Sequence, residues 1–208
     1  MSDFLPAEFR ARLEALLASG DRRLLGLVGA PGAGKSTLAQ ALADALGAQA
    51  QVVPMDGFHL ANAELARLGR AQRKGAPDTF DAAGYVALLR RLRLPAPGET
   101  VYAPAFQREI EEPIAGAIAV HPDTCLVITE GNYLLLDDGP WAEVAGLLDD
   151  CWYVDVDDTL RRQRLVERHM RFGRDEAAAR AWVEQTDEPN ARRIAASRGR
   201  AGAVIRLD

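Results

Sequence analysis

The sequence has few cysteines and no long apolar run. Its two cysteines, Cys125 and Cys151, form neither a CxxC pair nor a metal-binding spacing. Both lie in apolar stretches, so we expect buried, reduced thiols, as in a reducing cytoplasm. No run approaches the roughly 20 apolar residues that span a bilayer, and the start MSDFLPAEF lacks the basic and apolar regions of a signal peptide. We therefore expect a cytoplasmic protein without a membrane partner.

An excess of basic residues is also missing. The formal net charge is −5, from 25 Lys and Arg against 30 Asp and Glu. Nucleic-acid binders usually have a basic excess, so we expect no nucleic-acid partner. The 208 residues, 48% of them hydrophobic, are enough for one domain with a full core, which we place at residues 1–208. Monomer and homodimer both stay open.

Against this background, residues 29–36 read GAPGAGKS, the P-loop (Walker A) pattern. Glycines let backbone N–H groups wrap a phosphate chain closely, because no Cβ intervenes. In this pattern the lysine reaches the outer phosphates and the serine hydroxyl binds Mg²⁺. The pattern therefore predicts binding of ATP and Mg²⁺. The residues expected to bind the nucleotide are Gly29, Ala30, Pro31, Gly32, Ala33, Gly34, Lys35, Ser36 and Thr37.

The flanks of this loop agree with the motif. Residues 24–28, LLGLV, are a short apolar run typical of a buried strand. After the loop, leucines recur every four residues at Leu38, Leu42 and Leu46 before Gly47, which indicates a helix that ends there. Strand, loop and helix follow in the required order, and the helix N-terminus attracts anions.

Two carboxylates follow two other predicted strands. Residues 51–55 are a short strand that ends at Asp56, and residues 125–129 are a cleaner buried strand that ends at Glu130. The carboxyl ends of parallel strands face the ligand crevice of an open α/β sheet. Glu130 is in the Walker B position, where an acid binds Mg²⁺ directly or through water. We take Ser36, Glu130 and Asp56 as the metal-side residues.

Residues 60–120 are predicted to be an insertion on the substrate side. Asp81 is a candidate N-cap of a helix that Pro95 stops, residues 101–106 read as extended chain, and residues 107–113 as a charged turn. His59, close to Asp56, is either a substrate contact or a hydrogen-bonded structural group. The candidate substrate-binding residues are Asp56, Phe58, His59, Phe106 and Arg108.

A predicted helix from about residue 159 carries arginines at spacings of three and four. These are Arg161, Arg164, Arg168 and Arg171, with Arg174 in the turn that follows. An arginine face beside a phosphate site suggests a lid, at about residues 159–176, that stabilises charge on a transferring phosphoryl group. The alternative is a solvated face paired with Glu167, Asp175 and Glu176.

Together these segments resemble the P-loop small-molecule kinases that include uridine kinase, phosphoribulokinase and bacterial pantothenate kinase. The matching stretches are GAPGAGKS, MDGF at 55–58, RKGAP at 73–77, FD at 80–81, VYAP at 101–104, TEG at 129–131 and the arginine helix up to Arg174-Asp175. The combination of MDGFH with EGNYLLL is most similar to bacterial proteins named "putative fructose transport system kinases".

The resemblance implies a three-layer α/β/α P-loop NTPase fold with a mostly parallel sheet of about five strands and an arginine-bearing lid helix. It implies Lys35 on the phosphates, Asp56 as the catalytic base and Glu130 as the second metal-side carboxylate. Arg168, Arg171 and Arg174 are the lid candidates, and which one contacts the phosphoryl group is open. Pantothenate kinases have Tyr-Ser-His after VYAP, whereas this chain has Phe106-Gln107-Arg108 two residues on. The aromatic pair that uridine kinase places around its base is not evident either, so we expect a different acceptor pocket.

Two functions are consistent with these patterns. The first is an ATP-dependent kinase acting on a hydroxyl of a small metabolite, such as a sugar like fructose, a nucleoside or a pantothenate-like alcohol. The second is a nucleotide-binding regulator or accessory ATPase without an acceptor. Asp56 and the insertion favour the kinase, because a regulator needs neither a second acid nor an acceptor pocket.

Overall fold

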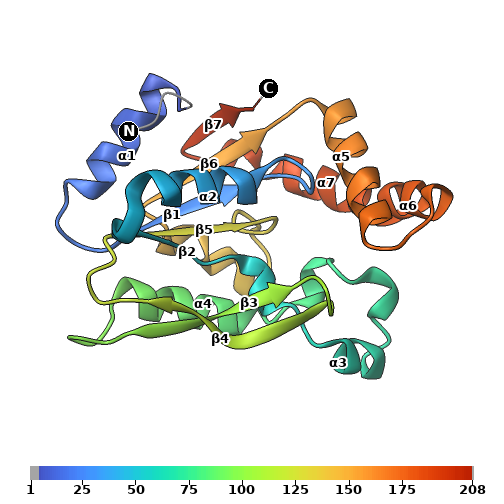
Figure 1. Cartoon of the computed structure of the whole chain (residues 1–208), viewed down its shortest axis with the longest axis horizontal. Coiled ribbons are helices and arrows are strands. Elements are labelled where there is room, and N and C mark those ends of the chain that lie inside the picture. The colour runs from blue at the N-terminus through green and yellow to red at the C-terminus, as the bar shows by residue number, and fades with distance from the viewer. Residues whose placement is uncertain (1–4, 208) are drawn as a thin grey trace.

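A computed structural model describes residues 5–207 of the chain (Figure 1). Its α-helices are α1 (Ala7–Leu17), α2 (Lys35–Leu46), α3 (Asn62–Arg67), α4 (Ala82–Arg93), α5 (Asp158–Arg171), α6 (Glu176–Trp182) and α7 (Glu188–Ala196). Its strands are β1 (Arg23–Val28), β2 (Ala50–Val52), β3 (Val101–Gln107), β4 (Glu112–Val120), β5 (Leu126–Gly131), β6 (Asp150–Asp155) and β7 (Ala203–Arg206). Short 3-10 turns, and one π-helical turn between α6 and α7, complete the chain.

Five strands form a parallel sheet in the order β2-β5-β1-β6-β7. The central strand is β1, which ends at the P-loop, and its neighbour β5 ends beside it with Leu27 opposite Glu130. Parallel strands bring their carboxyl ends to one edge, so the sheet itself places the P-loop and the strand-end acids together. The predicted α/β P-loop fold with a five-stranded, mostly parallel sheet is confirmed.

Side chains of the buried strands alternate between the two faces of the sheet. Leu25 and Leu27 of β1 pack with α1 and α2, whereas Leu24 and Val28 pack with α4 and α7. In Figure 1, α1 and α2 lie above the sheet and α4 lies below it. Helices therefore cover both faces, which is why strands β1, β5 and β6 are almost wholly apolar.

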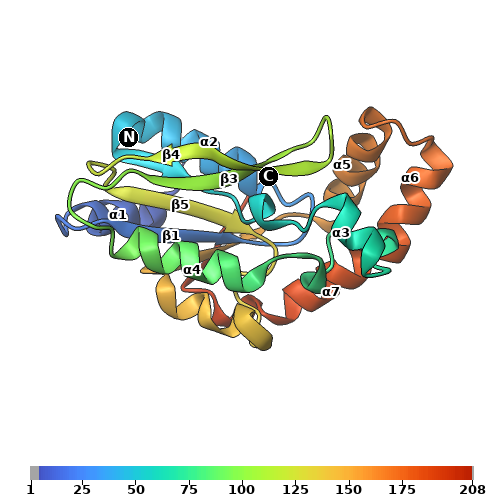
Figure 2. The same cartoon turned by 90° about the horizontal axis from the view of Figure 1, so that it is seen from below.

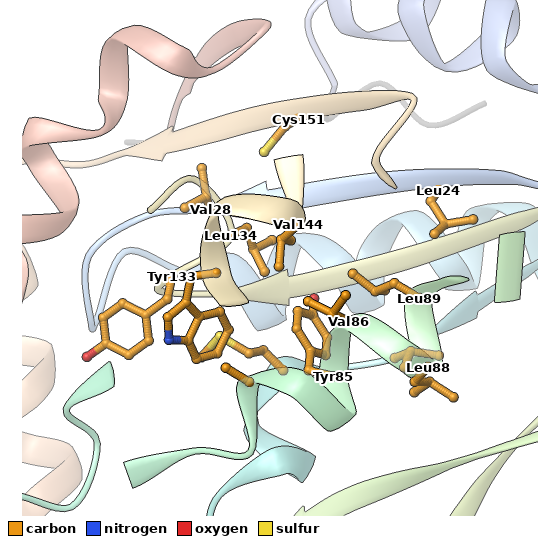
Figure 3. Packing of buried hydrophobic residues seen from close by; sticks show 14 of the residues in the cluster. Leu24, Val28, Tyr85, Val86, Leu88, Leu89, Tyr133, Leu134, Val144 and Cys151 are labelled. Atoms are coloured by element: carbon orange, nitrogen blue, oxygen red, sulfur yellow. The ribbon is translucent and has the colours of Figure 1, made fainter. Parts of the chain in front are cut away.

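The core below the sheet is rich in aromatic residues near the site (Figure 3). Tyr85 of α4 is fully buried, and its hydroxyl contacts Thr129 Oγ1 of β5 at 2.6 Å. Phe80, Tyr133 and Trp141 pack edge to face or tilted, with ring centroids 5.6–5.9 Å apart. This cluster fixes the segment before α4 against the sheet. Asp81 caps α4 as predicted, accepting from the Gly84 N–H at 2.8 Å.

The extended segment at residues 101–106 is one arm of an antiparallel hairpin, β3–β4 (Figure 2). The charged residues after it form the hairpin turn, but the second arm, β4, did not emerge from the sequence. Its central residues, Ala115 to Ala117 around Gly116, are small and exposed, so they lack the apolar alternation that predicts a strand. The hairpin lies beside the segment that precedes α4, which it contacts through Asn62.

The prediction for the cysteines is correct for one residue and wrong for the other. Cys151 in β6 is buried, and burial raises the pKa of its thiol to about 12. Cys125 is exposed, because it precedes β5 rather than belonging to its buried part. Among residues 5–207, no helix is long and apolar enough to cross a membrane.

Candidate active site

The P-loop joins β1 to α2 in a conformation that two of its glycines permit. Gly32 and Gly34 have φ values of +81° and +91°, in the region that L-residues avoid. A Cβ on Gly32 would also lie 2.8 Å from the carbonyl oxygen of Arg161 in α5. The loop is therefore pressed against the first turn of α5, and glycine is required there for space as well as for conformation.

Lys35 is buried at the start of α2, with 8% of its surface exposed. Its Nζ donates to the carbonyl oxygens of Gly29 at 2.9 Å and Ala30 at 3.1 Å, and to Asn132 Oδ1 at 2.8 Å. Burial lowers the pKa of Lys35, and the negative charges of Glu130 and Asp56 oppose that effect. The ammonium group thus lies inside the loop, where a phosphate oxygen would be its natural partner.

Ser36, in the first turn of α2, contacts Glu130 near the end of β5. Ser36 Oγ donates to Glu130 Oε1 at 2.9 Å. Burial raises the pKa of Glu130, the negative charge of Asp56 raises it further, and Lys35 and the Ser36 hydroxyl oppose both effects. Lys35 and Arg108 offset part of the negative charge of Glu130 and Asp56, and a bound cation would offset more of it.

These residues fit Mg²⁺ as it is usually bound beside a nucleotide. Within residues 5–207, no cluster of three or more acidic, histidine or cysteine side chains would hold a metal by itself. Mg²⁺ generally takes one or two carboxylates and completes its shell with phosphate oxygens and water. Ser36 and Glu130, which are in contact, would contribute oxygen donors to such a shared site, and Asp56 is the further candidate.

Asp56 lies in a 3-10 turn, Met55–Phe58, directly after β2. Its Oδ2 accepts from an Nη of Arg108 at 3.1 Å, at the tip of the β3–β4 hairpin. The next residue, Gly57, is packed so tightly on the hairpin that a Cβ would lie 2.3 Å from the carbonyl oxygen of Pro104. The strand end and the hairpin are therefore held in a fixed relation, and Asp56 faces Arg108.

This close approach predicts a strong effect at Gly57. In Gly57→Ala the new methyl group meets a backbone carbonyl, which cannot rotate away, so the hairpin must shift. We expect a loss of about 1–3 kcal/mol in the free energy of unfolding. The matched control is Gly146→Ala, because a Cβ there meets nothing within 4 Å. Denaturant unfolding of both variants checks this, and equal stabilities would contradict the packing argument.

The aromatic ring of His59 lies beside Asp56. Its Nδ1 is 2.8 Å from the Asp56 carbonyl oxygen, and its ring centroid is 4.0 Å from that of Phe80 and 4.7 Å from that of Phe106. Burial lowers the pKa of His59, so the ring is neutral at neutral pH. Phe58 turns the other way and packs on Tyr85 in the core. The structure therefore brings together four of the five candidate substrate residues, Asp56, His59, Phe106 and Arg108. The fifth, Phe58, packs against the core instead.

The arginines of α5 do not form one equivalent face. Arg161 is buried, with 2% exposed, whereas Arg171 is exposed. Arg168 is half-buried, and burial lowers the pKa of its guanidinium; the charge of Arg108 lowers it further, and Asp187 and Asp56 oppose this. The guanidinium of Arg174 lies 3.9 Å from the ring centroid of Trp182 in α6. Of the three lid candidates, Arg168 is therefore the half-buried one, Arg171 is exposed, and Arg174 packs on Trp182.

The alternative, a solvated arginine face paired with Glu167, Asp175 and Glu176, does not match the ion pairs found among residues 5–207. Glu167 contacts Gln163, Asp175 caps α6, and Glu176 binds Arg180. Helices α5 and α6 project beyond the carboxyl ends of the strands (Figure 1), which is where a lid would lie.

Several residues around the P-loop did not emerge from sequence reasoning. Asn132 follows Glu130 by two residues and holds Lys35; its place just after the strand-end acid was the available signal. Arg161 binds Glu188 of α7 and donates to the Pro31 carbonyl oxygen at 3.4 Å. No sequence signal could reveal that pair, since its members come from different helices and meet only in the folded chain.

A cavity of about 440 Å³ borders the P-loop on the side of β6. Its lining includes Ala30 and Ala33 of the loop, Val156 and Asp157 after β6, and Arg192 of α7. The P-loop therefore has open space on this side and the Asp56 site on the other side, toward β5 and β2.

Comparison with known proteins agrees with this geometry. The family model described as "Phosphoribulokinase / Uridine kinase family" matches residues 24–198, from β1 to beyond α7. The chain belongs to the phosphoribulokinase/uridine kinase family. The resemblance inferred from the motifs is confirmed, and the chain is a kinase of this family with the ATP-binding P-loop that defines it.

Named relatives of this kinase are similar over most of their length. It is 41% identical over 152 residues to the "ATP-dependent kinase-like protein notR'" of Aspergillus versicolor, covering 69% of this chain and 88% of that protein. It is 37% identical over 189 residues to the "Putative uridine kinase C227.14" of Schizosaccharomyces pombe, covering 86% and 80%. A crystal structure of a "putative fructose transport system kinase" from Silicibacter sp. TM1040 superposes with a TM-score of 0.84 at 40% identity, covering 94% of this kinase and 97% of that chain.

Proposed function

We propose that this kinase transfers the γ-phosphoryl group of ATP to a hydroxyl of a small metabolite. The observation that carries the proposal is the position of Asp56. It lies at the same sheet edge as Lys35, Ser36 and Glu130, yet it faces Arg108 of the hairpin. A second acid between the phosphate site and a separate pocket is what hydroxyl activation needs.

The P-loop side supplies binding and charge. Lys35 would exchange carbonyl partners for phosphate oxygens, because an ammonium–phosphate pair is charge-assisted. Ser36 and Glu130 would hold Mg²⁺, which offsets charge on the phosphates when bound. Asn132 keeps the Lys35 side chain in the loop from the opposite side. The cavity beside Ala30 and Ala33 is large enough for the nucleoside end of ATP, within the usual 300–1,000 Å³ of ligand pockets.

Asp56 would accept the proton of the attacking hydroxyl. A base must lie within hydrogen-bonding reach of the proton it takes; Asp56 Oδ2 accepts from Arg108, and Oδ1 accepts no hydrogen bond from any of residues 5–207. Gly57 and the His59 ring, bonded to the Asp56 backbone, fix the orientation of this residue. A positioned carboxylate needs no reorganisation when the proton moves.

The runner-up is a regulator or accessory ATPase without an acceptor. It would use the same P-loop, but Asp56, Arg108 and the hairpin would have no catalytic purpose. ADP formation measured with and without a panel of sugars, nucleosides and hydroxy acids separates the two. We expect at least one metabolite to stimulate ADP formation and to gain a phosphate, whereas stoichiometric release of inorganic phosphate with every metabolite would favour the regulator.

Among the lid arginines, Arg168→Ala should have the largest effect on turnover. Charge on the phosphoryl group accumulates in the transition state, so we expect kcat to fall about tenfold or more with a smaller change in Mg·ATP affinity. Arg171→Ala, at an exposed position, is the matched control, and Arg174→Ala should act mainly by loosening α5 from α6. Steady-state kinetics of the three variants checks this. Unchanged kcat in all three would mean that the helix is a solvated face.

A further inference from the structure

We propose that the acceptor carries an anionic group, a carboxylate or a phosphate, and that Arg108 binds it. This inference rests on the proposed function, since it concerns the class of metabolite that receives the phosphoryl group. The hydroxyl to be phosphorylated would lie at Asp56 while the anion of the same molecule engages the guanidinium beside it.

Arg108 differs from the neighbouring Lys74 in what it holds. Lys74 Nζ donates to Asn62 Oδ1 at 2.7 Å and to the backbone carbonyl of Glu111, and it is ion-paired with the Glu111 carboxylate. It therefore holds the segment before α4 against the hairpin tip. Arg108 makes one ion pair, with Asp56, and its side chain is 40% exposed. Lys74 therefore has a set of structural partners, whereas the partly exposed Arg108 makes one side-chain hydrogen bond, to Asp56, among residues 5–207, and its other donors remain for a ligand.

The partner that Arg108 has now is needed elsewhere during the reaction. Asp56 must accept a proton from the acceptor and also lies on the metal side with Glu130. When the Asp56 carboxylate takes part in proton transfer or metal binding, its ion pair with Arg108 is weakened. A guanidinium binds carboxylates and phosphates with paired, parallel hydrogen bonds, so an anion on the acceptor is the fitting replacement.

The surrounding charges point the same way. Arg108 is ion-paired with Asp56, whereas Lys35 is held inside the P-loop by the carbonyl oxygens of Gly29 and Ala30 and by Asn132. Within residues 5–207, Asp56 is the one carboxylate paired with Arg108, and Glu130 is hydrogen-bonded to Ser36. ATP phosphates would engage Lys35 and Arg168, from the P-loop and lid sides. Arg108 approaches Asp56 from the hairpin, on the acceptor side.

The His59 side chain beside Asp56 suits an acceptor with more than one hydroxyl. His59 Nδ1 lies 2.8 Å from the Asp56 carbonyl oxygen and therefore carries a hydrogen, and in that neutral tautomer Nε2 has a free lone pair. No buried side-chain nitrogen or oxygen in the described chain lacks a hydrogen-bond partner. The Nε2 atom, for which no bond is found, is therefore accessible to solvent and can accept from a second hydroxyl. Arg108, Asp56 and His59 together match a hydroxylated anion.

Paired ligands test this directly. Each set of three has the same number of carbon atoms and comprises a carboxylate, a phosphate ester and a neutral compound: glycerate, glycerol 3-phosphate and glycerol; erythronate, erythrose 4-phosphate and erythritol; gluconate, fructose 6-phosphate and fructose. Binding is measured by calorimetry in the presence of Mg²⁺ and a non-hydrolysable ATP analogue, and phosphorylation with ATP. We expect an anionic member of one set to bind roughly 10–100-fold more tightly than its neutral counterpart, as for a charge-assisted hydrogen bond. The carboxylate and phosphate arms show which anion the site prefers.

Arg108→Gln should abolish the preference for the anion and leave the affinity for the Mg·ATP analogue within about twofold, because the P-loop is untouched. Arg108→Lys should restore part of the preference. The matched control is Arg67→Gln, an exposed arginine of α3 paired with Glu64, which removes the same charge away from Asp56. Thermal unfolding of each variant shows that it is folded.

The outcomes separate this inference from the function on which it rests. If neutral compounds are bound and phosphorylated as well as anionic ones, with Arg108→Gln unimpaired, the kinase function stands and the anionic acceptor is wrong. If no compound of either kind binds or receives phosphate while Mg·ATP binds, both are wrong.

Discussion

Lys35→Ala will lower the turnover of this kinase by at least about 100-fold, the usual cost of removing a preorganised charge from a phosphoryl-transfer site. Lys35 is the buried cation of the P-loop, and its three hydrogen bonds hold it inside the loop. An alanine leaves the phosphates facing backbone N–H groups and Mg²⁺ alone. Charge that develops on the phosphoryl group then lacks its buried partner, so kcat should fall more than Mg·ATP affinity.

The measurement is steady-state kinetics together with calorimetric Mg·ATP binding. Thermal unfolding of the variant serves as the control, because Lys35→Ala also removes the partner of Asn132 and must be shown to be folded. Asn132→Ala should have a smaller effect, since it removes one of three acceptors and leaves the charge in place. Turnover near that of the wild type in Lys35→Ala would mean that this is not a working P-loop.

Asp56→Asn should lower kcat by roughly 10²–10⁴, the usual contribution of acid–base catalysis. Asparagine keeps the size of the side chain and an oxygen that can accept from Arg108, but it cannot take a proton. Mg·ATP binding should persist, because Lys35, Ser36 and the loop amides are unchanged. A modest change in metal affinity is expected, since one negative charge is lost near the cation site.

Glu130→Gln is the comparison that separates base from metal ligand. Glu130 is hydrogen-bonded to Ser36 and lies deeper than Asp56, so its loss should weaken Mg²⁺ binding first. Both variants are measured for kcat with acceptor and for Mg²⁺ and Mg·ATP affinity. If Asp56→Asn keeps its turnover while Glu130→Gln loses turnover with metal binding intact, the two roles are exchanged. If neither loses transfer, acceptor phosphorylation is the wrong reaction.

The P-loop half of the site could be predicted because its information is local. Eight consecutive residues specify the loop, and the flanking apolar runs specify the strand and the helix. Asp56 and Glu130 could be located because each lies at or shortly after the carboxyl end of a strand, and parallel strands bring their ends to one edge. Short-range sequence patterns are therefore enough to locate the P-loop and the two acids.

The acceptor half depends on contacts between distant segments. Arg108 reaches Asp56 only because β4 turns back on β3, and β4 lacks the pattern of a strand. The arginines at positions 161, 164, 168, 171 and 174 have spacings of three and four in sequence, yet packing places Arg161 in a buried ion pair with Glu188 and Arg174 on Trp182. Helical periodicity shows which residues share a stripe, but it does not show which element the stripe will meet.

The claim that this kinase phosphorylates a metabolite hydroxyl through Asp56 can be tested in one measurement. ATP labelled in its γ-phosphate is incubated with Mg²⁺, a mixture of small metabolites, and either the wild type or Asp56→Asn, and the labelled products are separated. The account predicts label in an organic phosphate ester with the wild type and at least about 100-fold less of it with Asp56→Asn. Label found in inorganic phosphate alone, at equal rates for both proteins, would contradict it.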